Sequence, residues 1–477
     1  MGNIKKNAVY NMLLSVSQIV FPLITFPYVT RILMPNGLGA VTFVDNYTQY
    51  FILIAALGIP VYGVREIAKV SRQSDKKDLI FSDLVTIHAI TTLLLTCLYV
   101  SSFLLIPKLQ TYHHLFLIGS GLLVSNVFLV EWYFQGTQAF PFITIRTLCV
   151  RFVTIIAIFS LIKKPSDLFL YYAIHVGSLL VNALINWSHA RQSVRFVFKI
   201  PPFAVYIKPL FFIFSTVLVT SVYTLLDSVF LGFLSTDAEV GYYTTAVKVS
   251  KIFIMLLSAL STVLLPPLAL AIHNRETNRA MVLLQKSYAY VCYLAVPISI
   301  GLFFLAGPII LLFAGNQYQE AIQPLRILSP TISIVGLNYV FGIQVLQATG
   351  NERYFFYATF VGMMVSIMFN LLLIPYFAGV GAAITNLLVE ASVLAISFYF
   401  AIKKFNFGVR IDLVLKAVVA STPFFLLTYL GQYFDLSPVQ QLLVTSFIGA
   451  ISYLVIQHYI WRNLLLGELL DFVFRRG

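Results

Sequence analysis

Charged residues are scarce in this sequence. Only 10% of its 477 residues are Asp, Glu, Lys or Arg, whereas soluble globular domains contain about 25%. Hydrophobic residues make up 59% of the chain, and apolar runs of roughly 20 residues, long enough to cross a bilayer, recur from end to end. This composition excludes a globular cytosolic protein and predicts an all-α integral membrane protein.

Cysteines and catalytic motifs are also sparse. Cys97, Cys149 and Cys292 lie far apart within apolar runs and have no CxxC spacing, so we expect neither disulfides nor metal ligands. The sequence contains no Walker A, HExxH or GxSxG motif, and its seven histidines show no metal-ligand spacing. We therefore predict that the protein is not an enzyme and that it needs no cofactor and no metal ion.

The net charge of +13 admits two explanations. A nucleic-acid partner is one, but cytoplasmic loops of membrane proteins are also rich in lysine and arginine, and we favour that explanation. Breaking the chain at its polar and Gly/Pro-rich joints gives about fourteen spans. If the N-terminus is inside, most of the basic residues outside the spans fall in inner segments. The pattern therefore predicts that both termini lie on the cytoplasmic side.

Three stretches share a short joint followed by a glycine. They are "RILMPNGLGAVTFVDN" (31–46), "LGFLSTDAEVGYYTTAVK" (231–248) and "IPYFAGVGAAITNLLVE" (374–390). Their spacing predicts that spans one to six and spans seven to twelve are parallel repeats. Repeats of this kind place a transport site between the two halves, near the bilayer midplane.

The repeats and the basic segments set the predicted domain boundaries. These are a six-helix N-terminal lobe over 1–190, a cytoplasmic linker over 191–208, a six-helix C-terminal lobe over 209–403, and two additional helices with a cytoplasmic tail over 404–477.

Three basic residues lie within predicted spans. Lys248 and Lys251 are three residues apart, so they share one helical face. Arg151 lies about 12 Å into the fifth span, counted from the inner side. A charge in hydrocarbon costs at least about 2.5 kcal/mol and is a functional candidate by default. We expect the three residues to form a cationic lumen that binds an anionic headgroup; the alternative is that each is neutralised by a carboxylate in a structural ion pair.

Three acidic residues in the spans are candidates for ion coupling. Asp45 occupies nearly the repeat-equivalent position of Lys248, so the two side chains are expected to meet. Asp227 lies near the outer end of span seven, and Glu390 at mid-depth in span twelve. A buried carboxylate without a partner can take up a proton. The alternative is a structural carboxyl group held by hydrogen bonds.

Glu131 and Arg146 face each other across a short inner joint between spans four and five. We predict that they form a structural ion pair that fixes this helical hairpin.

Several segments resemble bacterial polysaccharide flippases. The stretch "PLITFPYVTRILMPNGLGAVTFVDNYTQYFILIAALGIPVYGVREIAK" (22–69) is similar to the opening of Wzx-type O-antigen and capsule transporters of the MOP (MATE-like) superfamily. The segment 131–174, with its "EWYFQGTQAF" joint, continues the likeness, as do "LPPLAL" (265–270), "LRILSP" (325–330) and "QATGNERYF" (347–355). The resemblance covers essentially the whole chain.

This resemblance implies a fold, a substrate and partners. The fold is a bundle of fourteen helices in two lobes around a central cavity, in the bacterial cytoplasmic (inner) membrane. The substrate is an undecaprenyl-diphosphate-linked oligosaccharide used in lipopolysaccharide or capsule synthesis, moved to the outer leaflet by alternating access with H⁺ or Na⁺ antiport. Further partners are membrane lipid and the polymerase and chain-length regulator of the same pathway. We expect a monomer and no nucleic-acid partner.

Other functions stay open at this point. A multidrug antiporter of the same superfamily binds cationic drugs and favours an acidic cavity, which paired lysines oppose. A lipid II flippase carries a different sugar on the same lipid, and sugar specificity is not legible in the sequence. A membrane-embedded polymerase or ligase requires a large outer loop, whereas the predicted outer loops here are short.

Overall fold

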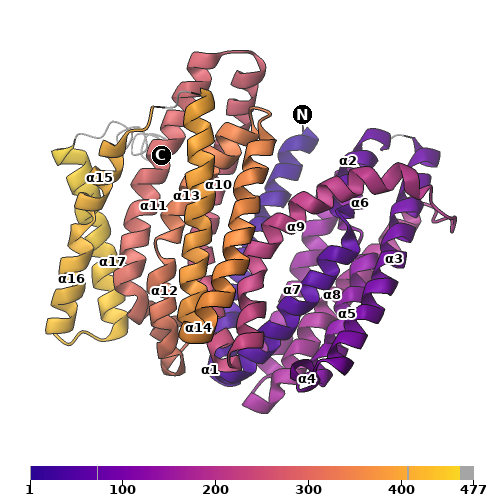
Figure 1. Ribbon diagram of the computed structural model, residues 1–477, viewed down its shortest axis with the longest axis horizontal. Coiled ribbons are helices and arrows are strands. Elements are labelled where there is room, and N and C mark those ends of the chain that lie inside the picture. Colours follow the sequence, from indigo (N-terminus) through magenta and orange to yellow (C-terminus); the bar gives the residue numbers. More distant parts are fainter. Residues whose placement is uncertain (1, 72, 406–407, 462–477) are drawn as a thin grey trace. The chain divides into compact units, whose positions relative to one another are not determined.

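The computed structural model describes residues 2–71, 73–405 and 408–461, and in these ranges it contains helices and no strand (Figure 1). The all-α fold class is thus confirmed for the described residues, whereas the predicted tail over 462–477 lies outside them. The chain divides into two compact units, Met1–Gly241 and Tyr242–Gly477. The predicted lobe boundaries, which differ from this division, stay a prediction.

The first unit is a bundle of long helices with two short ones between them. Its helices are α1 (Gly2–Ala56), α2 (Ile59–Val70), α3 (Ser74–Leu105), α4 (Pro107–Gln110), α5 (His113–Leu129), α6 (Glu131–Gly136), α7 (Phe140–Leu161), a 3₁₀ turn (Pro165–Asp167), α8 (Leu168–Ser193) and α9 (Phe203–Leu234). Residues 194–202, within the predicted linker, form no helix.

The second unit is also helical. It contains most of α10 (Asp237–His273), α11 (Thr277–Phe313), a 3₁₀ segment (Asn316–Ala321), α12 (Ile322–Leu328), α13 (Thr331–Asn338), a π-helical segment (Tyr339–Gln347), α14 (Glu352–Phe405), α15 (Ile411–Ala420), α16 (Thr422–Tyr433), α17 (Pro438–Val455) and a terminal π-helical turn (Ile456–Ile460).

Helix breaks occur in all three of the glycine-containing joints. α1 is kinked at Met34, with φ 61° and ψ 169°, and the residue before a proline, here Pro35, is disfavoured in the α conformation. α14 has a similar kink at Ala378, with φ 44°. The remaining joint separates α9 from α10. These breaks explain why the three stretches look alike in sequence, while the repeat relation itself stays a prediction.

Glycines let two of these joints pack against each other within the first unit. A Cβ atom on Gly39 would lie 1.7 Å from the carbonyl oxygen of Asp237, and a Cβ atom on Gly241 would lie 2.3 Å from that of Pro35. No side chain fits at such distances, so only glycine allows the first turn of α10 to lie this close to α1.

Many apolar side chains are exposed on the helices, as lipid-facing surfaces require. Leu93, Leu94 and Leu98 on α3 are 59–67% exposed. By length and composition, ten described helices can cross a membrane, or eleven if the bent pair Asn316–Leu328 and Thr331–Gln347 forms one span. The two kinked helices, α1 and α14, have 55 and 54 residues. Followed along its kinked path, each is about 80 Å long, more than twice the roughly 30 Å hydrocarbon core. The exact span number and the orientation stay predictions.

Candidate functional site

α7 carries two arginines and lies between α1 and α8 in the first unit (Figure 1). The helix begins at Phe140, with Pro141 in its first turn, where the missing N–H of proline costs nothing. Arg146 and Arg151 are five residues apart on it. At 100° per residue, they point about 140° away from each other. Arg146 is therefore directed toward α8 and Arg151 toward α1.

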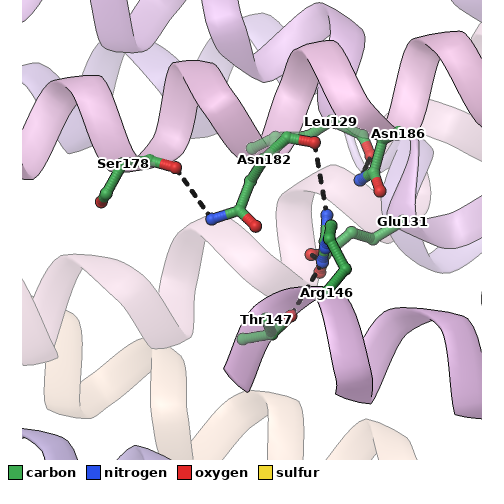
Figure 2. Close-up of polar contacts among 7 residues, drawn as sticks. All are labelled: Leu129, Glu131, Arg146, Thr147, Ser178, Asn182 and Asn186. Carbon is green, nitrogen blue, oxygen red and sulfur yellow. Dashed lines mark hydrogen bonds and ion pairs between the residues drawn. The ribbon is translucent and has the colours of Figure 1, made fainter. Parts of the chain in front are cut away.

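Arg146 is held by several polar partners. Its side chain is only 4% exposed, and its Nη2 atom lies 2.6 Å from Oε1 of Glu131. Nη2 also donates to the Thr147 hydroxyl at 2.9 Å, and Nη1 donates to the Asn182 carbonyl on α8 at 3.4 Å. Figure 2 shows the guanidinium between these groups. A buried cation with a carboxylate and a carbonyl around it joins three helices, which suits a structural role.

The position of Glu131 depends on a helix break. α5 ends at Leu129, and Val130 has φ 32°, a region that β-branched residues rarely adopt. The break leaves carbonyl groups at the end of α5 without helical partners. The buried Asn186 side chain on α8 donates to one of them, the Leu129 carbonyl (Figure 2). Asn186 thus holds the break that directs Glu131 toward Arg146.

Arg151 has a different environment. It is partly buried, and its Nη1 atom donates to the Ser17 hydroxyl on α1. The guanidinium carbon lies 6.0 Å from the centroid of the Phe21 ring, within the range of a cation–π contact. Among the described residues, Arg151 forms no ion pair with a carboxylate. It is therefore a charge within a span that is held by one hydroxyl group and one aromatic ring.

Beside Arg151 lies a cavity of about 440 Å³ between α1 and α7. Apart from Ser17 and Arg151, its lining is apolar and includes Val20, Phe21 and Ile24. This volume falls in the range of small-ligand pockets, and a mainly apolar wall with one or two polar groups is typical of them.

Asp45 on α1 lies beside His175 on α8. The distance between Asp45 Oδ1 and His175 Nε2 is 3.7 Å, too long for a hydrogen bond but within ion-pair range if the imidazole is protonated. Both side chains are partly exposed, at 26% and 42%. One turn along α1, the Thr48 hydroxyl lies 2.7 Å from the Tyr99 hydroxyl. The predicted meeting of Asp45 with Lys248 stays a prediction, because the two residues belong to different units.

The other two acidic candidates are also placed in helices. Glu390 on α14 accepts a hydrogen bond from Asn338 Nδ2, at 3.1 Å from Oε2. Asn338 is the last residue of α13, directly before the π-helical segment. Asp227 on α9 is 2% exposed. Lys248 and Lys251 lie on α10, the first half-buried and the second exposed.

Several residues of these sites were not predicted from the sequence. Ser17, His175 and Asn338 each contact a predicted site residue. One signal was available on α8, where His175, Ser178, Asn182 and Asn186 recur every three or four residues and so form a polar stripe. The contact between Ser17 and Arg151 has no local signal, because it depends on how α1 and α7 pack.

Together, the described helices and the charged groups inside them define a multi-pass membrane protein with polar sites within its spans. Residues 4–272 match the family described as "Polysaccharide biosynthesis protein", and residues 213–372 match the family "MatE". The first match covers more than half of the chain. The protein belongs to the polysaccharide biosynthesis protein family.

Curated relatives carry transporter or flippase names. The chain is 23% identical over 402 residues to a protein of Escherichia coli (strain K12) named "Putative O-antigen transporter", with 83% of this chain and 96% of the relative covered. It is 27% identical over 170 residues, 35% of each chain, to the "Probable flippase AglR" of Haloferax volcanii. These names agree with the expectation that the protein is not an enzyme.

Solved structures share the fold. A structure titled "Lipid II flippase MurJ, inward closed conformation" matches 96% of this chain and 99% of its own, with a TM-score of 0.76 and 17% identity. An inward-facing multidrug resistance MATE family transporter of the MOP superfamily matches 84% of this chain and 98% of its own, with a TM-score of 0.61 and 13% identity. At such identities the likeness concerns the fold.

Proposed function

We propose that the protein translocates an undecaprenyl-diphosphate-linked oligosaccharide repeat unit from the inner to the outer leaflet of a bacterial cytoplasmic membrane by alternating access. The observation that carries this proposal is a cation inside a span without a carboxylate partner, Arg151 beside its apolar cavity. A guanidinium donates up to five hydrogen bonds and binds phosphate bidentately. Membership of the polysaccharide biosynthesis protein family supports the oligosaccharide part of the proposal.

Lys248 and Lys251 complete the proposed set of phosphate contacts. Lysine acts on a phosphate as a point charge, whereas arginine fixes its orientation. Two lysines on one face of α10 and Arg151 on α7 therefore offer successive positions for the diphosphate during the cycle. A multidrug antiporter for cationic compounds is disfavoured by these positive charges, since they repel its substrates.

Coupling to an ion gradient is the second part of the proposal. The sequence contains no nucleotide-binding motif, which leaves an ion gradient or the substrate's own free energy as the driving force, and we propose an H⁺ or Na⁺ gradient used in antiport. Asp45, Asp227 and Glu390 are the candidate coupling groups. The Glu390–Asn338 contact supports a role in binding a proton or Na⁺, because the amide keeps the carboxylate oriented within the bundle.

Complementation tests the substrate. The gene is expressed in a strain that makes the matching repeat unit but lacks its own transporter, and surface polysaccharide is measured on gels. We expect the wild type to restore the polysaccharide and the K248Q/K251Q variant to reduce it at least about tenfold, as expected for losing charge-assisted phosphate contacts. K76Q, which removes an exposed lysine of α3, is the matched control and should restore it fully. A wild type that restores only lipid II transport would identify the alternative flippase function.

Reconstitution tests the coupling. Purified protein in liposomes should move the lipid-linked oligosaccharide faster when a pH or Na⁺ gradient is imposed, and the effective gradient identifies the ion. E390Q should abolish this acceleration but retain the basal rate. An unchanged rate in de-energised vesicles would exclude antiport.

A further inference from the structure

Arg151 lies at the centre of its span. α7 has 22 residues, Phe140–Leu161, and is therefore about 33 Å long, close to the roughly 30 Å hydrocarbon core. Arg151 is the twelfth of these residues, so its Cα lies about 17 Å from the start of the helix. Near the midpoint, the distance to both interfaces is greatest, and snorkelling of the side chain is least effective.

This depth distinguishes between two kinds of lipid. A resident phospholipid keeps its phosphate in the headgroup region, outside the hydrocarbon core. Its phosphate therefore cannot meet Arg151. A lipid that is being moved between leaflets must carry its phosphate through the midplane, and there the phosphate needs a cation.

The surroundings of Arg151 leave room for such a phosphate. Of its five N–H donors, one is used by Ser17, and no carboxylate among the described residues pairs with it. The cavity next to the guanidinium is walled on the α1 side by Val20 and Ile24 and on the α7 side by Phe152. A hydrocarbon chain attached to the phosphate would find apolar contacts there.

We propose that this cavity binds the junction between the phosphate and the hydrocarbon chain of a polyprenyl diphosphate. The phosphate contacts Arg151 and Ser17, and the first isoprenyl units lie along Val20, Ile24 and Phe152. This inference rests on the proposed function and adds to it a place for the lipid part of the substrate. It gives the three cations different roles. Arg151 binds the phosphate next to the hydrocarbon chain, whereas Lys248 and Lys251 on α10 are assigned contacts with the diphosphate alone.

Lipid binding to the full-length protein tests the inference. Native mass spectrometry from phosphatidylcholine nanodiscs, which keep a bilayer around the protein, measures the dissociation constants of undecaprenyl phosphate, undecaprenol and phosphatidylglycerol. R151Q should weaken undecaprenyl phosphate binding at least about tenfold, as expected for the loss of hydrogen bonds to a charged group. The same variant should change undecaprenol binding less than about threefold, because that lipid has no phosphate.

Two valines of α1 provide a matched pair for the chain site. Val16 and Val20 are one turn apart and similarly exposed, at 46% and 43%, but only Val20 lines the cavity. V20W should fill the cavity and weaken both polyprenyl lipids, whereas V16W should weaken neither. Equal effects of V16W and V20W, undiminished undecaprenyl phosphate binding in R151Q, or equally tight binding of phosphatidylglycerol would each overturn the proposal.

The complementation strain separates this inference from the proposed function. If the wild type restores surface polysaccharide and both R151Q and V20W restore it as fully as V16W, the cavity is not a substrate site and the function stands. If the wild type itself restores none, the proposed function is wrong.

Discussion

Arg146 and Arg151 lie on the same helix, yet their surroundings differ in every respect. Arg146 points toward α8, is 4% exposed on its side chain, and meets a carboxylate at 2.6 Å and a backbone carbonyl. Arg151 points toward α1, meets one hydroxyl group and one aromatic ring, and borders a cavity. Arg146 thus has its partners within the protein, whereas Arg151 keeps N–H donors for the ligand that we propose.

The difference shows how a charge in a membrane span can be interpreted. Removing a guanidinium from water is costly, so a span keeps one only where partners compensate for the cost. If the protein supplies a carboxylate, the charge serves the fold. If it supplies only neutral groups and an adjacent cavity, the charge is a candidate for binding an anion, as we propose for Arg151. Both residues are arginines on α7, Arg151 near its midpoint and Arg146 nearer its start, and their partners are what distinguish their roles.

The largest expected effect is on stability and comes from R146Q. This change leaves Glu131 without its cation and removes the hydrogen bond to the Asn182 carbonyl. It should lower the free energy of unfolding by about 3 kcal/mol. This is the lower end of the range for a broken buried pair, because Glu131 is 42% exposed. R151Q should lower the free energy of unfolding by less than about 1 kcal/mol, since it loses only the Ser17 hydrogen bond and the cation–π contact with Phe21. Thermal unfolding in detergent measures both. Equal losses would show that Arg151 is structural too.

A double-mutant cycle measures the pair itself. E131Q should cost about 1.5–2 kcal/mol, because the ion pair becomes a hydrogen bond from the guanidinium to a neutral amide while Arg146 stays buried. The doubly substituted E131Q/R146Q protein should be more stable than the sum of the single losses predicts, since no charge is left buried. Additive losses would mean that the two side chains do not interact in solution.

A smaller effect is expected at the helix break that positions Glu131. N186L removes the donor to the Leu129 carbonyl and should cost about 1 kcal/mol, as membrane hydrogen bonds typically do. N182L is the matched control on the same helix: its lost side-chain bond goes to the Ser178 carbonyl, and its own carbonyl still accepts from Arg146. N182L should therefore cost less. A greater loss in N182L would indicate that Asn186 does not hold the break.

The surroundings of Arg146 could be predicted from the sequence more fully than those of Arg151. Glu131 and Arg146 are separated by one short joint, so their closeness follows from local chain geometry. The membrane class follows from apolar runs whose length is set by the bilayer. The sequence shows Gly39 and Gly241 as part of the repeated joint pattern. Why these positions need glycine appears only in the structure, where the backbones of α1 and α10 touch.

The surroundings of Arg151 and Asp45 depend on helices that are distant in the sequence. Ser17 precedes Arg151 by 134 residues, and His175 reaches Asp45 from α8. Which face of one helix meets another in lipid is decided by side-chain packing, because apolar residues face both lipid and protein and leave no amphipathic signal. The sequence therefore indicated which residues are costly in a membrane, but not which of them have partners.

The smallest effect concerns an exposed ion pair at the start of α11, between Glu276 and Arg279. Unlike Arg146, both side chains are partly surrounded by water. Arg279 lies 2.9 Å from Glu276, and this hydrogen bond, with one from Asn274, lowers the pKa of the Glu276 carboxyl below its ordinary 4.5. A lowered folded-state pKa contributes stability above the unfolded-state value, and this contribution is lost as the pH falls through the folded-state pKa. The melting temperature of E276Q should therefore lie slightly below that of the wild type at pH 7, and the difference should vanish on acidification below pH 4.5. High salt should also reduce it, because exposed pairs are screened. A difference that persists at low pH would mean that the glutamate acts through packing and not through its charge.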